Sequence, residues 1–204
     1  MSEKFTHLHC HSEYSLLEGA LRISQMLEYC KEHNLSSIAL TDNGAMYGAI
    51  DFYLKAKENG IKPILGCEMY LTEDITKKER GFDRLILLCK DYEGYQSLIH
   101  LVTVAFLEGF YYRPRIDLKH LANNSKGLIA ISPGANGPVA YNISGNFEKS
   151  KEYAQSLKDI YGEDFYLGLQ KTGGSFEDII FEKTIEISKE LAIPLVATND
   201  AYYM

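Results

Sequence analysis

Two histidines near the start of the chain are the first residues that suggest chemistry. His9 and His11 are separated by one residue, and alternate side chains of an extended segment point to the same face. Two imidazoles on one face are a typical beginning of a zinc, manganese or iron site. The alternative is a pair of exposed or hydrogen-bonded histidines, and the pair alone does not decide between the two. Cys10 would face the opposite side and belong to the core.

Four carboxylates beside apolar stretches are candidate partners of these histidines. Asp42 ends the stretch SIALTD, Asp200 follows VATN, Glu68 interrupts an apolar run, and Glu18 lies in a loop. An isolated buried charge is costly, so each carboxylate needs a cation, a helix terminus or a basic side chain. Asp42 has the serious alternative of capping a helix that follows it. A cap is implausible for Glu68 inside a strand, which favours a cation or a basic side chain there.

The elements that must position these residues alternate between short apolar strands and amphipathic helices. Apolar residues three and four apart indicate the helices, and short apolar runs indicate the strands. Strands are predicted at residues 5–9, 37–42, 62–72, 84–89, 127–132, 164–170 and 194–198, and helices at 23–30, 50–57, 95–102, 117–121 and 176–191.

This alternation predicts a mostly parallel sheet, either doubly wound or closed into a barrel. In both architectures chemistry gathers at the carboxyl ends of the strands. The two histidines end the first predicted strand, Asp42 ends the second and Asp200 follows the last, while Glu68 lies in the third. We therefore expect these polar side chains to converge.

Composition narrows the class of protein. The chain has 204 residues, a length that suits one domain, with 46% hydrophobic and 24% charged residues. The net charge of −7 is unusual for a nucleic-acid-binding domain, so a role on DNA would need positive charge from elsewhere. There is no apolar run of roughly 20 residues and no signal-peptide pattern, which predicts a cytoplasmic protein without a membrane partner. The four cysteines include no CxxC pair, and three of them lie in apolar or strand-like stretches and are expected to be reduced core thiols.

Five segments resemble one family, in its order and over nearly the whole chain. They are HLHCHSEYSLLEGA (7–20), ALTDNGAMYGAIDFY (39–53), IKPILGCEMYLT (61–72), KGLIAIS (126–132) and PLVATNDAYY (194–203). Together they look like the PHP (polymerase and histidinol phosphatase) domain of bacterial DNA polymerase III alpha subunits, of the DnaE type. The resemblance implies an α/β fold, a distorted seven-stranded β/α (TIM-like) barrel. It also implies a single PHP domain over 1–204 that is a fragment of a longer polymerase chain.

The resemblance further implies a metal centre that has lost part of its ligand set. Intact members hold up to three ions with nine side chains. Four matching positions are unsuited: Asn43, Arg84 and Tyr202 stand where the family has histidines, and Gly134 lies about where it has a cysteine. The positions that still suit a metal are His9, His11, Glu18, Glu68 and Asp200, with Asp42 lining the site. At most one divalent ion (Zn, Mn or Fe) is expected, and a full trinuclear cluster is not.

Arg84 is the most consequential of these replacements. A guanidinium is always charged and cannot coordinate a cation. Among Glu18, Glu68 and Asp200 it would supply the positive charge that metal supplies in intact relatives. We therefore predict a charge-assisted hydrogen bond between Arg84 and at least one of these carboxylates.

These losses favour a structural and interaction module within a DNA-directed DNA polymerase chain. The alternative is a metal-dependent phosphoesterase, or a 3′–5′ proofreading exonuclease, with a reduced metal set. The resemblance implies the rest of the polymerase chain as a partner, a proofreading exonuclease subunit as a second, and DNA in the full-length context. The tripeptide Arg113-Pro114-Arg115 could contact phosphate or a partner, but a solvated loop is the favoured interpretation.

Overall fold

A computed structural model describes residues 5–134, 136–143, 145–171, 173 and 177–203. Its strands are β1 (Ser37–Leu40), β2 (Lys62–Leu71), β3 (Asp83–Cys89), β4 (Arg115–Ile116), β5 (Leu128–Ser132), β6 (Phe165–Leu169) and β7 (Leu195–Ala197). Its helices are α1 (Ile23–Glu32), α2 (Ala49–Glu58), α3 (Tyr92–Leu107), α4 (Leu118–Asn123), α5 (Pro138–Ile143), α6 (Phe147–Tyr161) and α7 (Glu177–Leu191), with a 3₁₀ turn at Gly162–Asp164.

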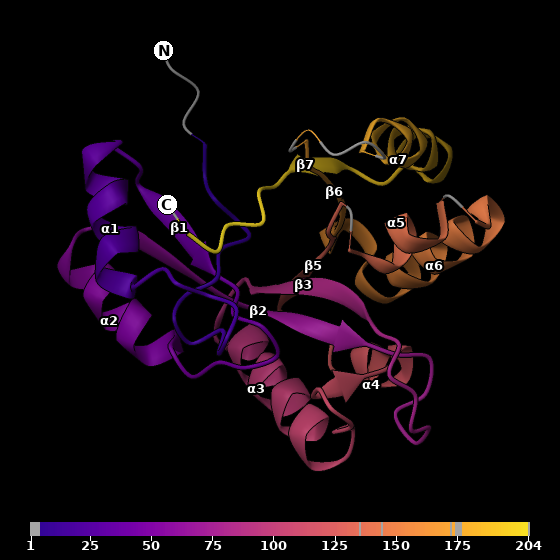
Figure 1. The fold of residues 1–204 in the computed structure, drawn as a ribbon, viewed down its shortest axis with the longest axis horizontal. Coiled ribbons are helices and arrows are strands. Elements are labelled where there is room, and N and C mark those ends of the chain that lie inside the picture. Colours follow the sequence, from indigo (N-terminus) through magenta and orange to yellow (C-terminus); the bar gives the residue numbers. More distant parts are fainter. Residues whose placement is uncertain (1–4, 135, 144, 172, 174–176, 204) are drawn as a thin grey trace.

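The strands form one curled, mixed sheet in the order β1-β2-β3-β5-β6-β7, with β4 beside β2 (Figure 1). Strands β1 and β2, β2 and β4, β5 and β6, and β6 and β7 pair in parallel. Strand β3 is antiparallel to both β2 and β5. The expectation of a mostly parallel sheet therefore holds except around β3, because no helix lies between β2 and β3 to carry a parallel crossover. The α/β fold with a distorted barrel is confirmed.

The first predicted strand is wrong, but its residues still connect the two edges of the sheet. Residues 5–9 form no regular strand, since their apolar alternation is weak. The segment 7–11 instead lies between β1 and the residues that follow β7, where the chain returns to the β1 side of the molecule (Figure 1). We call residues 7–11 and 200–202 the seam. Its backbone bonds are Ala39 N to His7 O (2.8 Å), Thr41 N to Cys10 O (2.9 Å), His11 N to Ala201 O (2.8 Å) and Ala201 N to His9 O (3.2 Å).

The helices expected from apolar spacing are present, and two others were not expected. The stripe predicted for 176–191 corresponds to α7, although Phe176 lies outside the described residues. Helices α5 and α6 were missed. In α6 the buried residues Ser150, Ala154, Leu157 and Tyr161 lie on one helix face, but the first two are small and the helix was not recognised from this spacing. Asn146 caps it by accepting a hydrogen bond from Lys149 N (3.2 Å).

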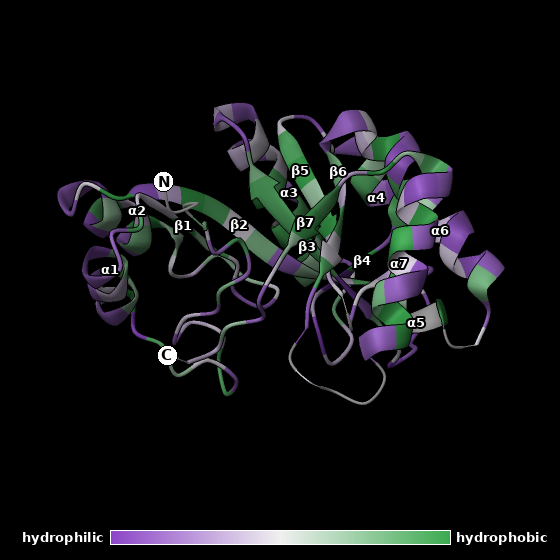
Figure 2. Cartoon of the chain, turned by 90° about the horizontal axis from the view of Figure 1, so that it is seen from above, coloured by the Kyte–Doolittle hydropathy of each residue, from purple (hydrophilic) through white to green (hydrophobic). Residues whose placement is uncertain are grey.

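Apolar strands and helix faces build the core around the sheet, and the outer helix faces are hydrophilic (Figure 2). One cluster joins β2, β3 and β5 to helices α3–α7, and a second joins α1 and α2 to β1. Cys10, Cys30 and Cys67 are buried free thiols, as expected, and Cys89 is partly exposed. Among the described residues, no helix combines the length and apolar character needed to cross a membrane.

Candidate metal centre

The seam presents its two histidines to the same side, as the alternation of an extended segment predicts. His9 and His11 are buried, and their ring centroids lie 4.9 Å apart. Cys10, between them, points away and packs in the apolar cluster of α1, α2 and β1. The expectation that Cys10 belongs to the core is therefore confirmed.

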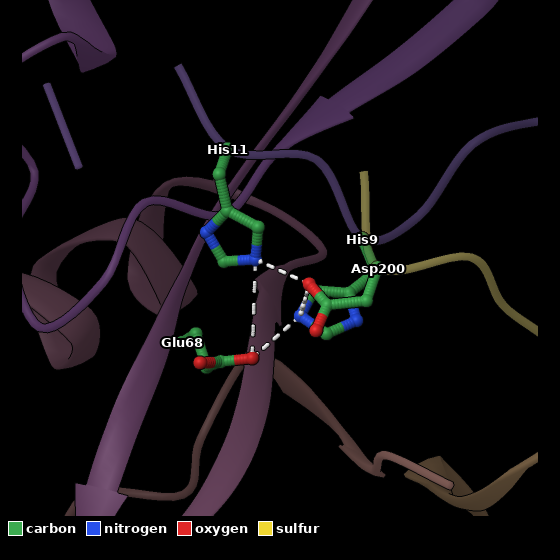
Figure 3. Close-up of side chains that lie close together, drawn as sticks. All are labelled: His9, His11, Glu68 and Asp200. Atoms are coloured by element: carbon green, nitrogen blue, oxygen red, sulfur yellow. Dashed lines mark hydrogen bonds and ion pairs between the residues drawn. The ribbon is translucent and has the colours of Figure 1, made fainter. Parts of the chain in front are cut away.

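Glu68 and Asp200 meet these histidines, so that four side chains converge from three distant parts of the chain (Figure 3). Glu68 is fully buried in β2, and Asp200 follows β7. One ligand atom from each of the four lies within 4.8 Å of the others. Glu68 Oε2 lies 2.5 Å from His9 Nε2 and 3.9 Å from His11 Nε2, while Asp200 Oδ1 lies 3.5 Å and 3.0 Å from the same two atoms.

The four donors suit a single divalent cation. Two imidazole nitrogens and two carboxylate oxygens form a set that zinc, manganese and iron accept. His11 Nε2 and Asp200 Oδ1 are buried and lie close, yet neither has a well-aligned hydrogen bond among the described residues. Burial disfavours the charged form of Asp200, but His11 and His9 hold the pKa of this carboxyl below its ordinary value. Buried polar atoms without an aligned hydrogen bond are what a bound cation would satisfy.

Arg84 forms the charge-assisted hydrogen bond predicted for it. Its Nη1 donates to Glu68 Oε1 at 2.8 Å, so Glu68 faces the histidines with one oxygen and the guanidinium with the other. Burial opposes the charged form, but Glu68 and Tyr202 raise the pKa of Arg84 above its ordinary value. Arg84 therefore neutralises Glu68 from inside the protein.

Tyr202 ties Arg84 to the histidine side of the cluster. Its ring stacks on His11, with centroids 4.1 Å apart and planes 6° apart. Its hydroxyl accepts a 2.8 Å hydrogen bond from Arg84 Nη1 and a longer one, 3.5 Å, from Asn43 Nδ2. Burial, followed by the charge of Glu68, raises the pKa of Tyr202 to about 12. The phenol thus stays protonated near neutral pH and acts as a spacer and hydrogen-bonding partner.

Glu18 is the candidate ligand that the structure does not bring into the cluster. Its carboxylate accepts hydrogen bonds from Asn43 Nδ2 and Arg113 Nη2, both at 2.7 Å. Its Oε2 lies 3.8 Å from Arg84 Nη2, so the guanidinium stands between Glu18 and Glu68. Glu18 belongs to a chain of ion pairs that runs from Arg113 through Glu18 and Arg84 to Glu68.

Asp42 stabilises the loop that follows the two histidines, and it caps no helix. Its carboxylate accepts hydrogen bonds from Ser12 N (2.6 Å), Ser12 Oγ (2.8 Å) and Ser15 Oγ (2.7 Å). Ser15 Oγ lies 3.4 Å from His11 Nδ1, so Asp42 positions the loop after the histidines. Sequence reasoning missed Ser12 and Ser15, although two short hydroxyl residues within four positions of His11 were an available signal.

Gly134 lies apart from the four donors. A Cβ at this position would meet Gln170, at 3.1 Å from its Cβ. The same loop reaches Arg84 through the carbonyl of Asn136, which accepts from Arg84 N at 3.0 Å. Gly134 therefore contributes no side chain to the centre.

The solvated loop expected at Arg113-Pro114-Arg115 is wrong for Arg115, which is 1% exposed. Its guanidinium donates to the carbonyls of Gly109 (3.1 Å), Glu79 (2.8 Å), Ile75 (3.2 Å) and Lys77 (3.0 Å). Arg113, in contrast, is half-exposed and pairs with Glu18. The helix expected after the tripeptide is α4, which Asp117 caps by accepting from His120 N.

Comparison with known proteins finds relatives that match nearly the whole chain. The chain is similar to DNA polymerase III alpha subunits of Borreliella burgdorferi (45% identity over 98% of this chain), Helicobacter pylori (40% over 99%) and Aquifex aeolicus (38% over 100%). It spans only 18–19% of the length of these relatives.

Two solved structures share the fold at low sequence identity. One is a protein of Bifidobacterium adolescentis described as a metal-dependent phosphoesterase (TM-score 0.65, 12% identity, 98% of this chain and 88% of that chain). The other is an amidohydrolase of Chromobacterium violaceum (TM-score 0.66, 13% identity, 97% and 87%). Residues 7–172 match the family described as the PHP domain. This match covers most of the chain, and with the converging histidines and carboxylates it shows that the chain belongs to the PHP domain family.

Proposed function

We propose that this chain is the PHP part of a cytoplasmic DNA polymerase III alpha chain, where it serves as a structural and interaction module. Relatives at 38–45% identity support the placement. The rest of the polymerase chain is the first partner in this proposal, and a separate proofreading exonuclease subunit is the second. DNA synthesis itself would be performed by residues outside this chain.

The observation that carries this proposal is the guanidinium of Arg84 at the cluster. It lies 2.8 Å from Glu68 and contacts Tyr202, while Arg113 forms an ion pair with Glu18 and Asn43 donates a hydrogen bond to it. Positive charge and hydrogen-bond donors thus occupy the side of the site where further ions would need ligands. With these groups in place, the site keeps its shape without a full metal cluster. A domain with a structural role needs no more than this.

A second candidate function is supported by the four donors that remain. His9, His11, Glu68 and Asp200 would hold one zinc, manganese or iron ion. Such an ion supplies a Lewis acid and lowers the pKa of bound water, the chemistry of metal-dependent phosphoester hydrolysis. In this candidate, Tyr202 keeps the ring of His11 in place and Arg84 holds Glu68.

Metal content and hydrolysis, measured on the same preparation, separate the two candidates. The chain is loaded with manganese or zinc, its bound metal is quantified, and a primed DNA with a mismatched 3′ end is added. The structural role predicts at most one ion per chain and no release of nucleotides. Release of nucleotides that is abolished in His9→Ala would instead establish the phosphoesterase. The His9→Ala control also excludes a contaminating nuclease.

A further inference from the structure

An apolar pocket lies at the end of the curled sheet opposite to the candidate metal centre. Its walls include residues near the start of β2, β5 and β6 and the last residues of β3. Because β3 is antiparallel to β2 and β5, these residues share one end of the sheet, whereas Glu68 and Arg84 lie toward the other. The pocket has a volume of about 540 Å³, within the roughly 300–1,000 Å³ that small-molecule sites occupy.

The pocket is formed by the face of the sheet that points away from the helices. Successive side chains of a strand point to opposite faces of a sheet. Leu128 and Ala130 of β5 pack in the core with the helices, while Ile129 between them faces the pocket. Tyr166 of β6 faces the pocket in the same way. The walls are therefore apolar, as the hydrophobic colour of these strands in Figure 2 also shows.

The side chains of these walls fill the space between them only in part. Strand β1 contributes no more than the methyl group of Ala39 to this layer. Five larger side chains of the layer keep part of their surface exposed to solvent: Leu8, Ile64, Ile129, Tyr166 and Val196. Apolar surface that is gathered in a hollow is typical of ligand-binding sites.

The charged side chains that line the pocket, Lys62 and Lys90, are both basic. Lys90 Nζ lies 2.7 Å from Asp164 Oδ2, so this pair carries no net charge, and Asp91 serves as the cap of α3. Lys62 is exposed and has no ion-pair partner within the part of the chain that the structure describes. Tyr166 adds a phenol that can donate a hydrogen bond. The polar groups of the pocket thus favour an anion over a cation.

We infer that this pocket binds a small molecule with an aliphatic tail and an anionic head, of the class of medium-chain carboxylates. The tail lies against Ile64, Ile129 and Val196, and the carboxylate faces Lys62 and the phenol of Tyr166. Four strands and the seam contribute to the walls, so an occupant must enter between them. That favours a flexible chain over a helix or a second copy of the protein. The inference goes beyond the proposed function, because the pocket shares no residue with the four metal donors.

Decanoate and decanol, which share a tail but differ in charge, test the two ends of the ligand. Each is titrated against the chain loaded with anilinonaphthalene sulfonate, a dye that fluoresces on apolar protein surface. Both should displace the dye saturably, and decanoate should raise the melting temperature. Lys62→Gln should weaken decanoate binding about two- to fivefold, the effect of one exposed ion pair, and leave decanol binding unchanged. Lys126→Gln, an exposed lysine outside the pocket, is the matched control and should bind both like the parent.

A second pair of variants tests the place of the tail. Val196→Phe puts a larger apolar side chain into the pocket, so it should abolish displacement of the dye by decanoate. Its melting temperature should not fall, because the added ring occupies open space and buries apolar surface. Leu195→Phe is the matched control, because Leu195 is 38% exposed and its side chain points to the opposite face of β7. It should bind decanoate like the parent.

Three results would overturn the inference. The first is no saturable binding of decanoate by the parent chain, and the second is unchanged binding of decanoate by Val196→Phe or by Lys62→Gln. The third is a parent chain that sediments as a dimer and a Val196→Phe variant that sediments as a monomer, since a second copy would then cover the pocket. All measurements are made in EDTA, so they are independent of metal content and nucleotide release, which test the proposed function.

Discussion

Three arginines of the chain carry the same charge but have different partners. Arg84 faces a buried carboxylate, Arg113 pairs with Glu18 at the surface, and Arg115 is enclosed by backbone carbonyls. The sequence identified Arg84 as a counter-charge because it stands among expected carboxylates. It did not predict that Arg115 is buried, because the partners of Arg115 are backbone carbonyls, which every residue type carries.

The enclosure of Arg115 predicts a large difference between two neighbouring substitutions. Arg115→Met should lower the free energy of unfolding by about 3 kcal/mol, because it leaves several buried carbonyls without a donor. Arg113→Met should cost less than about 1 kcal/mol, because its ion pair is half-exposed. Urea denaturation of both variants measures the difference. Equal losses of unfolding free energy would mean that Arg115 does not stabilise the β2–β3 connection.

Asp83, at the start of β3, should make stability depend on pH. Burial raises the pKa of its carboxyl to about 6 from an ordinary 3.8, with Lys149 opposing and Glu73 adding to the shift. The folded state therefore holds this proton more tightly than the unfolded chain does. The resulting stabilisation is present at low pH and is lost as the pH rises through about 6. Above that pH the buried, ionised carboxylate destabilises the folded state.

Replacing this carboxyl tests that pH dependence. Asp83→Asn should raise the melting temperature at about pH 8 by about 2–4 °C, the effect of ~1 kcal/mol in a chain of this size. At about pH 4 the gain should shrink or disappear, since the parent is then largely protonated in the fold. Thermal unfolding of both proteins across this pH range provides the measurement. A gain that is constant with pH would point to a cause other than ionisation.

At the scale of elements, the predictions that held rest on strong apolar periodicity. The spacing of Ile23 to Cys30 and of Tyr95 to Val102 corresponds to α1 and α3. The failures have physical reasons. Residues 7–11 are held by backbone hydrogen bonds to two flanking segments, and their sequence lacks the apolar alternation that identifies a strand. The buried face of helix α6 begins with the small residues Ser150 and Ala154 and becomes strongly apolar only at Leu157 and Tyr161, and β4 is only two residues long.

The contact between α3 and β5 depends on a close approach that only glycine permits. A Cβ on Gly94 would lie 1.8 Å from the carbonyl oxygen of Gly127, a backbone atom that cannot move without shifting the strand entry. Gly94→Ala should therefore destabilise the fold by about 1–3 kcal/mol or more through overpacking. Gly81→Ala is the control, because nothing lies within 4 Å of its added Cβ. Chemical denaturation should show a loss for the first variant and none for the second.

At the scale of the whole molecule, the candidate site joins the two ends of the described chain. His9 and His11 come from the first segment, Asp200 comes from the last, and Glu68 lies in β2. The sequence predicted these ligand types and their place near strand ends. It did not separate Glu18 from the others, because the path of a loop after the histidines has no periodic signal. Only the folded seam shows Glu18 turned toward Arg113.

Because the donors come from both ends of the chain, one bound cation should crosslink the two segments of the seam and stabilise the entire fold. An ion bound to the four donors only in the folded state, at about 100 times its dissociation constant, adds about 2.7 kcal/mol. The melting temperature should then rise by about 5–10 °C. Hydrogen exchange at the amides of His11 and Ala201, which bond across the seam, should slow in parallel.

Two substitutions decide which side chains hold that ion. His11→Ala should abolish the metal-dependent rise in melting temperature, because it removes one of the four converging donors. Glu18→Gln should preserve the rise, because Glu18 is bonded to Asn43 and Arg113 outside the cluster. The comparison uses each variant's own metal-free melting temperature, which separates metal binding from a general loss of stability. If Glu18→Gln removed the rise while His11→Ala kept it, the ion would lie on the Glu18 side of Arg84, and the seam would have to be stable without it.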